Sequence, residues 1–225
     1  MLLPMLVCGL VCSQPVSLAV VAAAQPSAKS ATRFVMVASD PHVRPSNPDY
    51  IAISKAVARA LTSQGFEQAK AEDDSNLVVV IDWMVGDPKE VVRHAGGDAG
   101  TPAVTGAPPG GRGGMPIGGT NNSASFGFGM EAQDQAHFVW IRTYTLKGVD
   151  KAAYKADPMA KALWEMTVSS EGESDDAAAA APAVMAGAMP YIGQSTGKTV
   201  KFRISATEDS VKYVRGDIPA LPEKK

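Results

Sequence analysis

Cysteine is scarce in this chain, and both of its cysteines lie close to the start. They are Cys8 and Cys12, in a sequence of 225 residues. Residues 25–225 therefore offer no thiol for a disulfide, for nucleophilic catalysis or for zinc coordination through sulfur. A disulfide-stabilised scaffold and a cysteine-dependent enzyme are excluded for that part of the chain.

The chain also lacks a surplus of positive charge. Its formal net charge is −2, and its lysines and arginines form no dense cluster. Proteins that bind nucleic acids need basic groups to neutralise phosphates, so we expect no nucleic-acid partner. Apolar residues make up 45% of the chain and charged residues 20%, close to the averages of globular domains. The composition therefore predicts a folded domain.

Charged side chains are absent from residues 1–24, which are mostly apolar. Ala22-Ala23-Ala24 supplies the small residues that signal peptidase accepts, so we predict a signal peptide that is cleaved after Ala24. One alternative is a retained membrane anchor, although polar residues and a proline interrupt the apolar run. Another is lipidation of Cys8 or Cys12, although each follows a valine. We expect a periplasmic or secreted protein, with membrane association only if this segment is retained or lipidated.

Hydrophobic patterns in the remaining chain predict the order β-α-β-β-β-α-β. The clearest signal is Asn47-Pro48-Asp49, which is typical of a helix start, followed by an apolar face at helical spacing and then Gly65. The predicted strands are 33–38, 77–85 with a continuation at 90–93, 136–146, 162–168 and 198–205, and the predicted helices are 48–64 and 177–189. Loops rather than helices join the three central strands. We therefore expect an α+β fold, with a mainly antiparallel sheet and two helices packed on one face.

Residues 95–130 differ from the rest because they are rich in glycine and proline. Such a composition does not offset the entropy lost on ordering, so we expect a disordered insertion there. The predicted domain is 33–215, after a flexible leader at 25–32 and before a loose tail at 216–225. Apolar side chains near the end of the insertion are candidate contacts with a partner: Phe126, Phe128 and Met130.

Catalytic and metal-binding motifs are not evident. The sequence has no Gly-x-Ser-x-Gly nucleophile elbow. Its histidines, His42, His94 and His137, are widely spaced. Asp40 and His42 could place two metal ligands on one side of an extended segment, but that spacing is common. The segment 193–199 ends like a phosphate-binding loop, but it has one residue too few between its glycines. We expect neither an enzyme nor a bound metal or cofactor.

Tryptophan is rare, but each predicted inner strand carries one. These are Trp83, Trp140 and Trp164, and Tyr144 lies near them in the sequence. One interpretation is that the rings pack between the sheet and its helices, which we favour. The other is an aromatic groove on the uncovered sheet face, which would bind a small ligand or a glycan.

Several segments of the sequence resemble the corresponding segments of one protein family. They are Tyr50 to Phe66, Asn76 to Val79, the strand around Trp140, Leu163-Trp164-Glu165, and Pro182 to Gly193. The family consists of Gram-negative envelope proteins, often lipoproteins, and is known only as a domain of unknown function. The resemblance implies an envelope location and an α+β fold, and it brings no catalytic residues. We therefore predict a non-catalytic protein that contacts another envelope protein or the envelope itself, with a small-ligand or glycan binding module as the alternative.

Overall fold

A computed structural model describes residues 15–93 and 135–222 of the chain. The chain divides into two compact units, one formed by Met1–Lys89 with Phe138–Lys225 and the other by Glu90–His137. The described parts of the second unit are strand residues of β5 (Lys89–Arg93) and β6 (Gln135–Asp150), and these two strands pair. The predicted glycine-rich insertion lies outside the described residues. The helices and the hydrophobic core belong to the first unit.

A mixed sheet of eight strands forms the body of the fold. Its path is β3-β2-β4-β6-β7-β1-β8, and β5 pairs with β6 off this path. The remaining strands are β1 (Val16–Ala24), β2 (Arg33–Ala38), β3 (Glu67–Gln68), β4 (Leu77–Val85), β7 (Trp164–Gly172) and β8 (Val200–Ile204). β2 runs parallel to β3 and β4, whereas β4, β6, β7, β1 and β8 pair antiparallel. The predicted α+β class with a mainly antiparallel sheet is confirmed.

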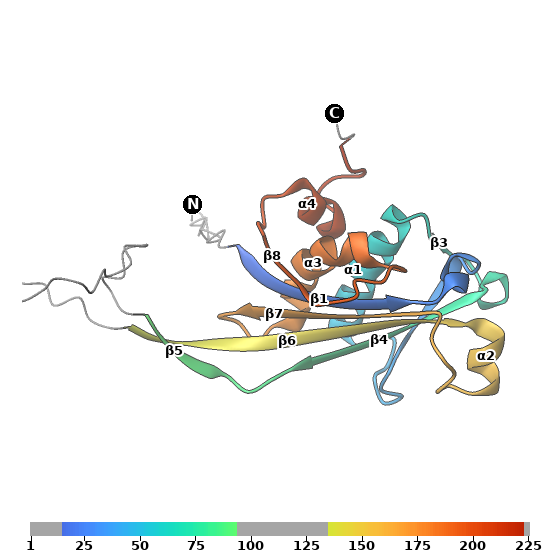
Figure 1. The fold of residues 1–225 in the computed structure, drawn as a ribbon, viewed down its shortest axis with the longest axis horizontal. Helices are drawn as coiled ribbons and strands as arrows, with labels where there is room; N and C mark the ends of the chain where they lie inside the picture. Colours follow the sequence, from blue (N-terminus) through green and yellow to red (C-terminus); the bar gives the residue numbers. More distant parts are fainter. Residues whose placement is uncertain (1–14, 94–134, 223–225) are drawn as a thin grey trace, which may run out of the picture. The chain divides into compact units, whose positions relative to one another are not determined.

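Three helices cover one face of this sheet, as Figure 1 shows. They are α1 (Pro48–Ser63), α3 (Ala177–Ala188) and α4 (Asp209–Arg215). The short α2 (Lys151–Ala156) lies at one end of the sheet and contacts β4. The prediction located α1 and α3 and missed the two shorter helices. None of the helices within the described ranges is both long and apolar enough to cross a membrane.

Helix α1 forms where its local sequence predicts. The side-chain oxygen of Asn47 accepts hydrogen bonds from the backbone N–H groups of Asp49 and Tyr50, at 2.9 and 3.1 Å. These bonds satisfy two N–H groups that have no partner within the helix. Gly65 follows the helix with a φ of 87°, a conformation that glycine adopts without strain. The buried face of α1 consists of Ile53, Ala56, Val57, Ala60 and Leu61.

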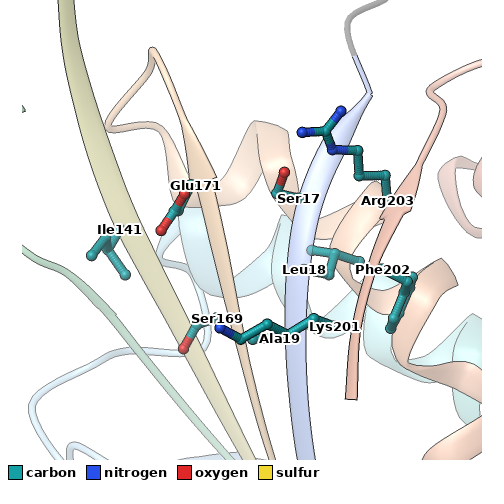
Figure 2. A pocket seen from close by; sticks show the side chains of 9 residues that line it. All are labelled: Ser17, Leu18, Ala19, Ile141, Ser169, Glu171, Lys201, Phe202 and Arg203. Carbon is teal, nitrogen blue, oxygen red and sulfur yellow. The ribbon is translucent and has the colours of Figure 1, made fainter. Parts of the chain in front are cut away.

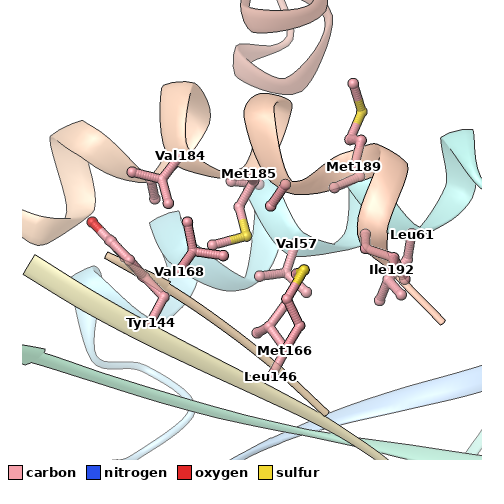
Figure 3. Close-up of a cluster of buried hydrophobic side chains, with 14 of the residues drawn as sticks. Val57, Leu61, Tyr144, Leu146, Met166, Val168, Val184, Met185, Met189 and Ile192 are labelled. Atoms are coloured by element: carbon pink, nitrogen blue, oxygen red, sulfur yellow. The ribbon is translucent and has the colours of Figure 1, made fainter. Parts of the chain in front are cut away.

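The hydrophobic core lies between this helix layer and the sheet. Helix α3 is apolar on almost every side, which suits a helix that contacts the sheet, α1 and α4 together. Pro182 lies inside α3 and does not end it. The core side chains seen in Figure 3 come from both layers: Val57, Leu61, Tyr144, Leu146, Met166, Val168, Val184, Met185, Met189 and Ile192.

Strand β1 occupies a position that the sequence did not predict. It lies inside the sheet between β7 and β8, and Leu18, Val20 and Ala22 point into the core. The described sheet therefore includes residues upstream of residue 33, the predicted start of the domain. A short run of small apolar residues is compatible with both a signal peptide and a buried strand, so composition did not distinguish them. Cleavage after Ala24 stays a prediction.

Candidate functional site

The side of the sheet opposite α1, α3 and α4 is here called the open face. Successive side chains of a strand point to opposite sides, so each strand contributes every second residue to this face. Along β7 the buried Met166 and Val168 alternate with Thr167 and Ser169, which are only partly buried on the open face. Side-chain oxygens of Thr143 and Ser169 lie 3.3 Å apart, and so do those of Thr145 and Thr167. The middle of the open face is therefore a patch of paired hydroxyl groups.

A cavity of about 550 Å³ lies across four neighbouring strands at this face, and we call it the trough. Figure 2 shows the side chains that line it. They come from β6, β7, β1 and β8: Ile141, Ser169, Glu171, Ser17, Leu18, Ala19, Lys201, Phe202 and Arg203. The trough therefore combines an apolar floor with two hydroxyl groups and three charged groups.

The charged groups of the trough come from its two sides. Lys201 extends from β8 across Ala19 toward Ser169, and the guanidinium of Arg203 turns toward the start of β1 (Figure 2). Glu171 stands on β7, with its carboxylate directed toward β6. Within the described part of the chain, none of these three charged side chains forms an ion pair. Two cations and one carboxylate are thus available to a bound molecule.

Tyr144 and Trp164, two of the predicted ligand-binding residues, lie in the core beneath the helices. Both are almost fully buried. The hydroxyl of Tyr144 donates a 2.5 Å hydrogen bond to the carbonyl oxygen of Ala177, and burial raises the pKa of this phenol above its ordinary value. The Trp164 ring packs over Gly148 and lies 6.2 Å from the ring of Phe66. Neither aromatic side chain reaches the open face.

The other two aromatic candidates also point to the helix side of the sheet. Trp83 stacks on Tyr50 of α1, with ring centroids 6.4 Å apart. Trp140 lies beside Phe138, with a centroid distance of 6.4 Å, and it shares the face of Tyr144 because the two are four residues apart on one strand. The predicted aromatic groove on the uncovered face is therefore not formed by these four residues. Large rings gain more free energy from packing against helices than from exposure.

Phe126, Phe128 and Met130, the predicted partner contacts, lie outside the described residues. The segment that resembles a phosphate-binding loop is a turn that holds β1, because the side-chain oxygens of Ser195 and Thr196 accept hydrogen bonds from backbone N–H groups of Ala24 and Ala22. Among the residues that the structure describes, no three histidine, aspartate, glutamate or cysteine side chains are grouped as metal ligands would be.

A second polar cluster lies on the helix side of the sheet. Arg142 is only 5% exposed, and its Nε has no hydrogen-bond partner in the described chain. It is paired in register with Ser170, whose buried hydroxyl also has no partner there. Burial lowers the pKa of Arg142, while Tyr144 and Asp176 partly offset that effect. The Arg142 side chain fits because Gly172 has no Cβ, which would lie 2.3 Å from Nη2.

Comparisons with known proteins add little to this description. No protein-family model matches the chain, and no curated protein matches it either. Among solved structures, the chain is similar to a PDZ domain protein from Parabacteroides distasonis ATCC 8503, at 11% identity and a TM-score of 0.42. The match covers 86% of this chain and 40% of that one, so the chain spans well under two thirds of the length of that protein. A likeness at this level carries no argument about function.

Proposed function

We propose that this protein is a non-catalytic binding domain of the bacterial cell envelope, which uses the trough on its open face to hold a partner that presents acidic groups. The observation that carries the proposal is the pair of cations on β8, Lys201 and Arg203, which line a cavity and have no ion-pair partner among the described residues. The envelope location is supported by the apolar start of the chain and by the resemblance to envelope proteins.

The spacing of the two cations suits an extended segment. Lys201 and Arg203 are two residues apart on one strand, which places them about 6.6 Å apart along it. An extended peptide repeats its side chains with the same period, so carboxylates at alternate positions would each meet one cation. Arginine binds a carboxylate with two parallel hydrogen bonds, which fixes the orientation of the partner.

The rest of the trough adds selectivity. Ile141 and Ala19 form an apolar floor, and the hydroxyls of Ser17 and Ser169 offer hydrogen bonds to a peptide backbone. Glu171 places a negative charge on the opposite side of the trough. A uniformly acidic polymer would be repelled there, so the trough favours a segment that carries both acidic and neutral or basic groups.

A small apolar ligand is the second candidate. A cavity of about 820 Å³ lies among α3, β8 and the residues that follow α4. Its lining includes Tyr191 and Phe202, whose ring centroids are 6.1 Å apart, together with Met189 and Leu221. Pockets of this size with apolar walls bind small molecules in other proteins. Binding of such a ligand would be weakened by Phe202→Ala and unaffected by changes at Lys201.

Charge reversal with an acidic peptide tests the main proposal. The probe is a fluorescein-labelled Glu-Ala-Glu-Ala-Glu peptide, whose binding is measured by fluorescence anisotropy at low salt. We expect the double variant Lys201→Glu/Arg203→Glu to weaken binding about tenfold, because an exposed ion pair contributes ~0.2–1 kcal/mol and reversal replaces attraction by repulsion. The matched control is Lys55→Glu/Lys161→Glu, which makes the same charge change at exposed positions away from the trough. Equal weakening in both variants would mean that net charge, not the trough, attracts the peptide.

Photo-crosslinking in living cells extends the test to the natural partner. Benzoylphenylalanine at Ser169 should form an adduct, whereas the same residue at Ile51, which is exposed on α1, should not. The adduct should disappear in the Lys201→Glu/Arg203→Glu background. An adduct that persists unchanged in that background would overturn the proposal.

A further inference from the structure

We infer that Val16–Ala24 remains part of the mature protein, so that any leader removed from this chain ends before Val16. This inference concerns maturation, and it needs no assumption about the ligand of the trough; the trough itself requires β1, because Ser17, Leu18 and Ala19 line it. It rests on the place of β1 in the sheet, on the bonds that hold it and on the side chains that it buries.

Strand β1 is bound along both of its edges. On one edge it pairs with β7 from Ser17, opposite Glu171, to Ala24, opposite Trp164. On the other edge it pairs with β8 from Val16 to Val20. An N-terminal strand with partners on both sides is an interior strand of the sheet.

The hydrogen bonds continue across the bond that signal peptidase would cut. In the turn that precedes β8, the N–H of Thr196 donates to the carbonyl oxygen of Ala22 at 2.9 Å, and the Ser195 hydroxyl accepts from the N–H of Ala24 at 2.9 Å. The N–H of Gln25 donates to the carbonyl oxygen of Leu163 at 2.8 Å. The residues on either side of the Ala24–Gln25 bond are therefore fixed to two different segments of the domain.

The inner face of β1 is also part of the core. Leu18, Val20 and Ala22 are each at most 5% exposed. Helix α3 approaches the strand so closely that a Cβ on Gly187 would lie 2.4 Å from Cδ1 of Leu18. The small residue Ala22 thus has a structural role as a buried strand residue.

Cleavage after Ala24 would remove more than a terminal extension. In the described sheet β8 pairs only with β1, so β8 would lose its connection to the sheet. The edge of β7 would lose its hydrogen-bond partners, and the core under α3 would lose its side chains from β1. Retention of Val16–Ala24 avoids each of these losses.

Mass spectrometry of the mature N-terminus is the direct test. The full chain, with a tag at its C-terminus, is produced in a Gram-negative host that exports it, and the purified protein is digested with trypsin. The first lysine or arginine is Lys29, so the N-terminal tryptic peptide ends there. We expect a peptide that begins at or before Val16. Recovery of Gln25–Lys29 as the N-terminal peptide of the folded protein would overturn the inference.

A pair of neighbouring substitutions tests the same claim by stability. Val20 is 0% exposed in the core, whereas Val21 is 47% exposed on the open face. Val20→Asp in the full chain should abolish the cooperative thermal transition, and Val21→Asp should leave the Tm within a few degrees of wild type. Both variants place one aspartate in the same apolar run, so an effect on export would be shared. Identical melting of the two variants would show that β1 is absent from the mature fold.

Discussion

Replacement of Gly148 by alanine tests how tightly the core is packed around Trp164. The two residues face each other on β6 and β7, and the indole lies directly over the glycine. A Cβ at position 148 would lie 2.2 Å from both Cε2 and Nε1 of the indole, and 2.8 Å from Cζ2. Ordinary contacts between carbon atoms are about 3.5–4.0 Å, so the ring would have to move by more than about 1 Å.

The expected loss of stability follows from two opposing effects. Forcing an extra methyl group into a packed core costs about 1–3 kcal/mol. Replacing a glycine in a strand by alanine raises the free energy of unfolding by roughly 0.5–1 kcal/mol, because alanine loses less backbone entropy on folding. We therefore expect Gly148→Ala to lower the free energy of unfolding by about 1–2 kcal/mol, which corresponds to a Tm decrease of about 2–8 °C.

Urea denaturation followed by circular dichroism and tryptophan emission measures this change. The control is Gly86→Ala, where the nearest atom to the new Cβ would be a carbonyl oxygen at 3.6 Å. That variant should show wild-type stability or a slight gain. In the background of Trp164→Phe, whose ring is smaller, Gly148→Ala should cost clearly less. The same cost in both backgrounds would refute steric conflict with the indole as the cause.

Two further predictions concern single side chains that form hydrogen bonds. Asn47→Ala should destabilise the protein by about 1 kcal/mol in urea denaturation, because it removes the cap of α1, and Asn47→Asp should restore most of the loss; wild-type stability of the alanine variant would contradict this role. Tyr144→Phe should cost about 1–2 kcal/mol, because the carbonyl of Ala177 loses its buried donor. Burial raises the pKa of the Tyr144 phenol, so its contribution is complete below the unfolded pKa of about 10 and is lost as the pH rises above that value. Thermal melts between pH 8 and 11 should thus fall more steeply for wild type than for the Phe variant, and parallel profiles would contradict the assignment.

Much of the fold could be predicted from local sequence because local signals are strong there. The cap at Asn47 and the apolar spacing that follows it predicted α1, and the β-branched run after Leu77 predicted β4 with the observed ends. The Ala-rich run predicted α3. In each case the segment carries its own signal, through caps, periodicity or side-chain shape, that does not depend on distant partners.

Other elements depend on contacts that no local pattern encodes. Strand β1 has alanine and valine on its open-face side as well as its core side, so it lacks the polar alternation of a half-exposed strand. The parallel pairing of β2 with β4 follows from the helix between them, which carries the chain back across the sheet. The short α2 and α4 are too brief for a periodic signal.

The trough could not be predicted from the sequence, because it too depends on contacts between distant segments. The alternation of residues 198–205 predicted that Lys201 and Arg203 point outward, and their placement agrees. Their meeting with Ser17, Ser169 and Glu171 depends on β1 lying between β7 and β8. The sequence shows that each predicted inner strand carries an aromatic residue. It does not show which side of the sheet the ring occupies, because that depends on where the helices pack.

The position of β1 also sets the order in which this protein is completed during synthesis. Ala22 and Thr196, which share hydrogen bonds, are 174 residues apart in the chain. Strand β1 leaves the ribosome before β7 and β8 and therefore waits without these partners until they have emerged, and such distant pairings form slowly. A chain that stops before residue 200 has one edge of β1 bare and prone to pair with other molecules. Late closure of this kind leaves the sheet incomplete until synthesis of the domain is nearly finished.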